Sequence, residues 1–201
     1  MVRGIPGVAV RGTGRKAPGR VDERTTLGPM RYAAFLRAIN VGRNNRVQMA
    51  DLRELCQGLG FEHVMTYLQS GNLVFDAGEE EEAVAARLEA GLTRAGLNRT
   101  HPVVRAGEEL RALSRVRPFN GYDGEELRHF VTLFRERLPD GAAAFVSGHG
   151  FEIAGVRERE VFWVVEAGLD RGIDAGGMLE KKLHLRGTTR YWHVVEAVAA
   201  L

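Results

Sequence analysis

Residues 31–60 read "RYAAFLRAINVGRNNRVQMADLRELCQGLG". An apolar run at the start gives way to a turn-rich segment at 40–46, after which apolar residues recur at the spacing of one helix face. Short apolar runs between turn residues are typical of buried strands, and a three-to-four-residue apolar repeat is typical of an amphipathic helix. The stretch therefore predicts a strand, a connecting loop and a helix.

The next segments extend this pattern to a complete unit. Two β-rich runs at 63–69 and 72–76 are separated by Ser70 and Gly71, which predicts a hairpin because glycine readily adopts positive φ. A helical repeat at 79–96 and a short apolar run at 101–106 follow. The order β-α-β-β-α-β is that of a ferredoxin-like unit.

The second part of the chain repeats the pattern less regularly. The segments that we expect to be regular are a strand at 128–136, a helix from Pro139 to Phe145, a hairpin of 151–155 with 159–168, a helix at 178–184 and a final helix from Thr189 with Thr188 as a possible N-cap. The closing strand of this second unit is not apparent. We expect an α+β fold of two ferredoxin-like halves, 30–115 and 116–201.

Composition narrows the class of protein. The chain has 201 residues, 44% hydrophobic, and carries a net charge of +2. Residues 1–29 alone hold six basic and two acidic side chains, so we expect a disordered basic extension before a slightly acidic body, which does not favour nucleic-acid binding. No apolar run approaches the roughly 20 residues of a membrane-spanning helix. The single cysteine, Cys56, suits a cytoplasmic protein.

The loop at 40–46 is the first candidate ligand site. Its residues of interest are Asn40, Gly42, Arg43, Asn45 and Arg46. A strand-to-helix connection directs backbone N–H groups and a helix N-terminus toward one edge of the sheet, where anions are favoured. The P-loop and dinucleotide-binding patterns are both absent. Turn chemistry alone explains the same residues equally well.

Two further polar groups are candidates. Gln69, Ser70 and Asn72 gather at the hairpin, where a turn is the favoured interpretation over a nucleophilic serine, and no catalytic residue is assigned. Near the C-terminus, Lys181, Arg190 and Trp192 combine cations with an aromatic ring that could stack on a nucleotide or a single strand. The favoured alternative places Trp192 on the buried face of a helix.

Metal and cofactor chemistry is not expected. The six histidines show no metal-binding spacing such as H-x-x-x-H, and one cysteine cannot build a thiolate zinc site.

Three segments carry a resemblance to a known family. They are "LRAINVGRNNRVQM" at 36–49, "GFEHVMTYLQSGN" at 60–72 and "LEKKLHLRGTTRYWHVVEAVAAL" at 179–201. The first resembles the L-R-G-I-N-V-G-x-x-N-x-[IV]-x-M motif of the DUF1697 family, and the others resemble its later motifs. Ala38 stands where that family usually has glycine. The resemblance implies a paired ferredoxin-like α+β fold and brings no settled activity.

Three functional hypotheses remain open. The first is a cytoplasmic protein that binds a phosphorylated or otherwise anionic small molecule, nucleotides included, through the loop at 40–46. The second is a hydrolase or group-transfer enzyme that uses Ser70 or a loop carboxylate. The third is a module for single-stranded nucleic acid or for protein interaction, which the acidic body makes less favourable. The sequence leaves the oligomeric state open.

Overall fold

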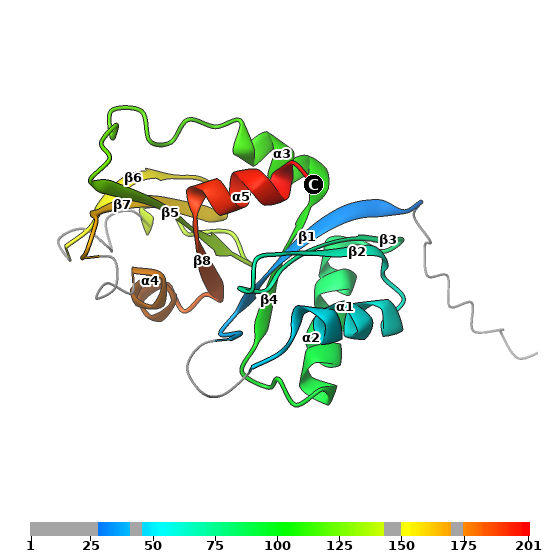
Figure 1. The fold of residues 1–201 in the computed structure, drawn as a ribbon. Helices are drawn as coiled ribbons and strands as arrows, with labels where there is room; N and C mark the ends of the chain where they lie inside the picture. Colours follow the sequence, from blue (N-terminus) through cyan, green and yellow to red (C-terminus); the bar gives the residue numbers. More distant parts are fainter. Residues whose placement is uncertain (1–27, 41–45, 143–149, 170–174) are drawn as a thin grey trace, which may run out of the picture.

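A four-stranded antiparallel sheet with two helices on one face forms the first half of the computed structural model (Figure 1), which describes residues 28–40, 46–142, 150–169 and 175–201. The elements up to the link between the halves are β1 (Met30–Arg37), α1 (Met49–Gly58), β2 (Glu62–Tyr67), β3 (Asn72–Ala77), α2 (Glu81–Arg94), β4 (His101–Ala106) and α3 (Gly107–Ser114). The strand order is β2-β3-β1-β4 with antiparallel neighbours throughout. The predicted β-α-β-β-α-β unit is confirmed.

The second half has the same topology. Its elements are β5 (Leu127–Phe134), β6 (Glu152–Val156), β7 (Glu160–Glu166), α4 (Ala175–Leu183), β8 (Gly187–Tyr191) and α5 (Trp192–Ala199). The strand order β6-β7-β5-β8 repeats that of the first sheet. The α+β class and the two ferredoxin-like halves are therefore confirmed. Residues 143–149, which include most of the helix expected from Pro139 to Phe145, lie outside the described residues, as do residues 1–27.

One prediction for the C-terminal segment is wrong. The final helix begins at Trp192 rather than Thr189, and the segment before it is the missing closing strand, β8. Thr188 and Thr189 pair with Leu133 and Thr132 of β5 instead of capping a helix. Their β-branched side chains fit a pleated sheet, and the edge of β5 gives their backbone groups partners that a short isolated turn would lack.

The strand registers define which residues of the two halves are equivalent. Ala33 of β1 pairs with Val74 of β3 and with Arg105 of β4. Val131 of β5 pairs in the same way with Phe162 of β7 and Arg190 of β8. Arg105 and Arg190 therefore occupy equivalent positions, each one residue before the end of the last strand of its half.

Three apolar cores hold the molecule together. One lies between the first sheet and helices α1 and α2, and another lies between the second sheet and α4. The third core contains residues of both halves: Phe35 and Val74 of the first sheet contact Val131 and Phe162 of the second. Helices α3 and α5 run side by side over this shared core (Figure 1). Buried residues thus lie on both faces of each sheet.

None of the helices built from described residues is long and apolar enough to cross a bilayer.

Candidate functional site

The end of β1 and the β2–β3 hairpin meet at one edge of the first sheet. Leu36 N donates to Gly71 O at 2.8 Å, and Asn40 Nδ2 donates to Gln69 O at 2.9 Å. Asn40 also exchanges hydrogen bonds with the backbone of Val47, through its Oδ1 at 2.8 Å and its Nδ2 at 3.2 Å. The two polar segments singled out in the sequence therefore lie together, and the side chain of Asn40 fastens one to the other.

The described residues include only part of the predicted loop. Gly42, Arg43 and Asn45 lie outside the described residues, and Arg46 is exposed just before α1. The Asn40 backbone adopts φ 54°, a left-handed conformation that asparagine tolerates better than most residues. Its side-chain bonds to backbone groups support the turn-forming role that the sequence left open.

The hairpin is organised around Asn72, whose side chain is fully buried. Asn72 Nδ2 donates to Tyr67 O at 2.9 Å and to Ser70 Oγ at 3.0 Å. Ser70 Oγ is thus engaged within its own turn, which supports the interpretation as a hairpin residue. The Asn72 side chain has one remaining group, Oδ1, and this atom faces the second half of the molecule.

Arg190 of β8 reaches across from the second half and fills this position. Its Nε donates to Asn72 Oδ1 at 2.6 Å, and its Nη2 donates to Leu36 O at 2.8 Å and Ser70 O at 3.0 Å. Its Nη1 donates to Thr188 Oγ1 and Thr189 O, both at 2.8 Å. All five N–H groups are satisfied, but every acceptor is a neutral oxygen, and no carboxylate of the described residues forms an ion pair with Arg190.

A pocket of about 290 Å³ opens beside Arg190, and we call it the Arg190 pocket. It is formed by the end of β1, the first turns of α4, and β8, with Arg37, Ala38, Gly176, Gly177, Glu180, Gly187, Thr188, Thr189 and Arg190 as its lining. Arg37 pairs with Glu180. Among the described residues of the lining, the charged side chains are two arginines and one glutamate, which together carry +1.

The first turn of α4 approaches β8 closely because residue 176 is glycine. A Cβ atom at Gly176 would lie 2.2 Å from Thr189 Oγ1, which is well inside contact distance. The positive end of the α4 dipole is therefore held against the wall of the Arg190 pocket that β8 forms.

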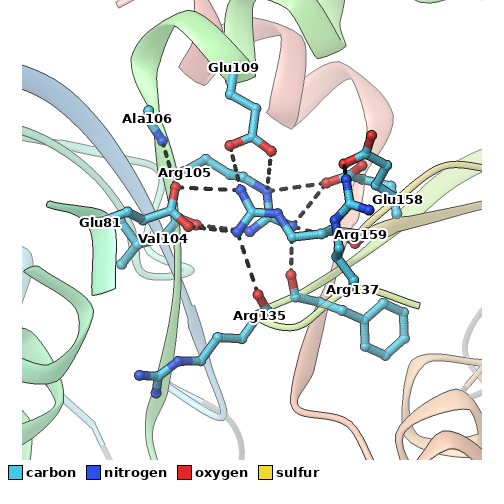
Figure 2. A network of polar contacts seen from close by, with 11 residues as sticks. Glu81, Val104, Arg105, Ala106, Glu109, Arg135, Arg137, Glu158 and Arg159 are labelled. Carbon is cyan, nitrogen blue, oxygen red and sulfur yellow. Dashed lines mark hydrogen bonds and ion pairs between the residues drawn. The ribbon is translucent and has the colours of Figure 1, made fainter. Parts of the chain in front are cut away.

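The equivalent position in the other half is closed by the chain's own carboxylates (Figure 2). Arg105 is fully buried, and its Nη2 donates to Phe134 O at 2.6 Å, as Arg190 Nη2 does to the equivalent Leu36 O. Here, however, Glu160 accepts from both Nε at 3.2 Å and Nη2 at 2.9 Å. Glu109 lies 3.5 Å from Arg105 Nε, so Arg105 has two acidic partners, whereas no carboxylate of the described residues pairs with Arg190.

Additional ion pairs surround this closed position. Arg159 contacts Glu81 and Glu109, and Arg135, which is equivalent to Arg37, contacts Glu82 and Glu89. Figure 2 shows the carboxylates of Glu81 and Glu109 directed at the guanidinium groups from two helices of the first half. This network, unlike the Arg190 pocket, carries an excess of acidic groups.

The two arginines differ electrostatically as a result. Burial lowers the pKa of Arg190 to about 10, and no neighbouring acid opposes that shift. Burial also lowers the pKa of Arg105, but the Glu160 carboxylate acts in the opposite direction. Both groups are cations at neutral pH, and Arg190 is the one whose charge the described residues leave unbalanced.

The remaining candidates lie away from this pocket. Lys181 is exposed in the last turn of α4. Trp192 is only 7% exposed and packs in the shared core, which confirms its favoured role as a core residue. Burial raises the pKa of the Cys56 thiol to about 12, which suppresses thiolate chemistry. Among the described residues, no group of three or more histidine, cysteine or acidic side chains could hold a metal ion.

Two features of the site were missed by sequence reasoning. One is that Arg105 and Arg190, which we call the crossed arginines, each reach across to the other half. The other is the contribution of α4 to the pocket. One signal was available for Arg105. It lies two residues after Val103, on the same face of a buried strand, so its guanidinium needs an acidic or carbonyl partner. No comparable local signal identifies the contribution of Gly176 and Gly177, because it depends on how α4 packs against β8.

Comparison with known proteins agrees with this fold. The solved structure of a conserved bacterial protein from Streptococcus pneumoniae superposes with a TM-score of 0.67 at 22% identity, covering 86% of this chain and 98% of that one. No curated protein matches the sequence. The family model for "Protein of unknown function (DUF1697)" matches residues 30–162, and the chain therefore belongs to the DUF1697 family.

Proposed function

We propose that this protein binds a phosphorylated or otherwise anionic small molecule in the Arg190 pocket. The observation that carries the proposal is the contrast between two equivalent arginines. Arg105 and Arg190 donate to equivalent backbone carbonyls across the halves, but carboxylates of the described residues balance Arg105 and not Arg190. The ligand class is the one expected from the sequence, but the proposed binding groups are those of the Arg190 pocket instead of the loop at 40–46.

The charge of Arg190 is energetically unfavourable in its buried position. A partly desolvated guanidinium is stabilised most by an opposite charge nearby, because Coulomb interactions strengthen where water is displaced. An anion in the Arg190 pocket would provide for Arg190 what Glu160 provides for Arg105. The charge of +1 on the described residues of the lining favours such a ligand over a cation.

Hydrogen bonds to the ligand would come mainly from other groups, because the N–H groups of Arg190 are engaged. Thr188 Oγ1 accepts from Arg190 and retains its own proton to donate. Arg37 adds a second guanidinium whose charge Glu180 partly offsets. The volume of about 290 Å³ is near the lower end of the roughly 300–1,000 Å³ range of ligand pockets, which favours a small ligand.

Thermal unfolding of the full chain tests this function. The panel contains inorganic phosphate, pyrophosphate, a sugar phosphate and the nucleoside mono-, di- and triphosphates. A ligand at about 100 times its Kd stabilises a protein by roughly 2.7 kcal/mol, so the midpoint should rise by several degrees. We expect at least one anion to give this shift and Arg37→Ala to reduce it.

The matched control is Arg137→Ala, which also removes an ion-paired arginine but lies outside the Arg190 pocket. This variant should keep the ligand-induced shift. An unchanged midpoint across the whole panel, or equal shifts in wild type and Arg37→Ala, would contradict the proposed function.

A further inference from the structure

Two equivalent residues determine how each crossed arginine is balanced. Asn72 begins β3 and pairs with Phe35 of β1, and Glu160 begins β7 and pairs with Leu133 of β5. Each side chain accepts a hydrogen bond from the Nε of the arginine of the other half, at 2.6 Å for Asn72 and 3.2 Å for Glu160. The geometry is shared, and the charge of the acceptor differs.

Asn72 makes hydrogen bonds to Arg190 and to the hairpin without carrying a charge. Its Oδ1 receives Arg190 Nε, and its Nδ2 holds the hairpin through Tyr67 O and Ser70 Oγ. A carboxylate at the same place would neutralise the guanidinium within the chain, as Glu160 does for Arg105. The neutral amide therefore positions Arg190 without cancelling its charge.

We infer that Asn72 is the residue that makes the Arg190 pocket selective for anions, because its neutral side chain leaves the charge of Arg190 to be balanced by the ligand. This inference rests on the proposed function. It extends that function by naming a positioning residue that need not touch the ligand. It also assigns the neutralisation of Arg105 in the other half to Glu160.

The test measures the affinity of the full chain for an anion by isothermal titration calorimetry. The anion is pyrophosphate, unless another member of the panel stabilises wild type more, in which case that anion is used. Asn72→Asp adds a carboxylate against Arg190, whereas Asn72→Ser changes the hydrogen bonds and keeps the site neutral. We expect Asn72→Asp to weaken anion binding at least tenfold more than Asn72→Ser, in buffers of equal ionic strength.

A second pair of variants covers the case in which Asn72→Asp does not fold, since it replaces a buried donor facing Tyr67 O. Thr188→Asp places a carboxylate on Arg190 from β8, and Thr188→Asn is its neutral counterpart. The aspartate variant should again bind the anion at least tenfold more weakly than the neutral one. Circular dichroism and a cooperative thermal transition establish that each variant is folded.

The outcomes separate the two claims. If the aspartate and neutral variants both bind the anion as tightly as wild type does, the inference about Asn72 is wrong and the proposed function stands. If both kinds of variant bind it more weakly than wild type and by the same factor, the effect is structural and the inference is again wrong. If wild type binds no anion of the panel, the proposed function fails, and the inference fails with it.

Discussion

At the scale of single residues, Ala38 shows why the family motif usually has glycine at this position. Ala38 adopts φ 58° at the wall of the Arg190 pocket, directly after β1. A left-handed conformation costs an L-amino acid roughly 1–2 kcal/mol, and glycine avoids this cost while losing more entropy on folding. We expect Ala38→Gly to raise the free energy of unfolding by about 0.5–1 kcal/mol, measured by urea denaturation.

Ala33→Gly is the control for this prediction, because Ala33 lies in the extended backbone of β1 and is buried. Glycine in a strand interior weakens the strand, so this variant should be less stable than wild type. Destabilisation of similar size at both positions would contradict the role assigned to the φ angle of Ala38.

The residues of the candidate site could be predicted only in part. The sequence brought Asn40, Ser70 and Asn72 to notice as polar residues near turns or strand ends, and Arg190 as a cation close to an aromatic residue. It did not show that Arg190 contacts Asn72, since these residues are 118 positions apart and meet only when the halves pack. The charge balance around Arg190 depends on that packing and is therefore invisible to local pattern.

At the scale of elements, the first half was predictable because each strand and helix has its own pattern and turn residues. β8 was not, because five residues are too few to show a period and two adjacent threonines also suit a helix cap. Pairing with β5 decides in favour of the strand, and only the tertiary structure provides that partner.

The β2–β3 hairpin depends on Gly71 for two reasons. Gly71 has φ +72°, and a Cβ atom there would lie 2.4 Å from Ile39 Cγ2 and 2.9 Å from Leu36 Cβ. We expect Gly71→Ala to destabilise the protein by about 2–4 kcal/mol, which combines left-handed strain with overpacking, as measured by chemical denaturation.

Gly96→Ala isolates the part due to overpacking. Gly96 has a similar φ of +82°, but nothing lies within 4 Å of a Cβ atom built there. Its substitution should cost only about 1 kcal/mol, from backbone strain alone. Equal losses at the two glycines would show that the contact with Ile39 and Leu36 relaxes freely.

At the scale of the whole molecule, Glu89 of α2 links the halves through charge. Its carboxylate accepts from Arg135 Nη1 at 3.1 Å and Arg186 Nη1 at 2.8 Å, and His101 Nδ1 lies at 3.3 Å. Burial alone would raise the pKa of Glu89, but these groups outweigh it and lower the pKa. Glu89 therefore stabilises the fold above the pKa of the unfolded chain, and this contribution is lost as pH falls through the folded-state pKa.

Comparison of wild type with Glu89→Gln at several pH values checks this linkage. The variant should be less stable than wild type at pH 7, and the difference should shrink as pH falls below about 4, where Glu89 of the unfolded chain takes up a proton before Glu89 of the folded protein does. Glu54→Gln, at an exposed position of α1, is the matched control and should show a much smaller change with pH. A pH-independent difference for Glu89→Gln would contradict the assigned ion pairs.

The shared core implies that the two halves unfold as one cooperative unit. Phe35 and Val74 of the first sheet are buried against Val131 and Phe162 of the second, so either half alone would expose a large apolar surface. Both tryptophans of the chain, Trp163 and Trp192, belong to the second half and report on its unfolding by fluorescence.

A substitution confined to the core of the first half tests this cooperativity. Val84 of α2 is fully buried between α2 and the first sheet, in a cluster without second-half residues. We expect Val84→Ala to cost about 2 kcal/mol and to lower the midpoint of the tryptophan transition by roughly 4–8 °C, because unfolding of the first half removes one side of the shared core. If calorimetry detects the loss while the tryptophan transition stays in place, the halves unfold separately, and the crossed arginines and shared core do not couple them.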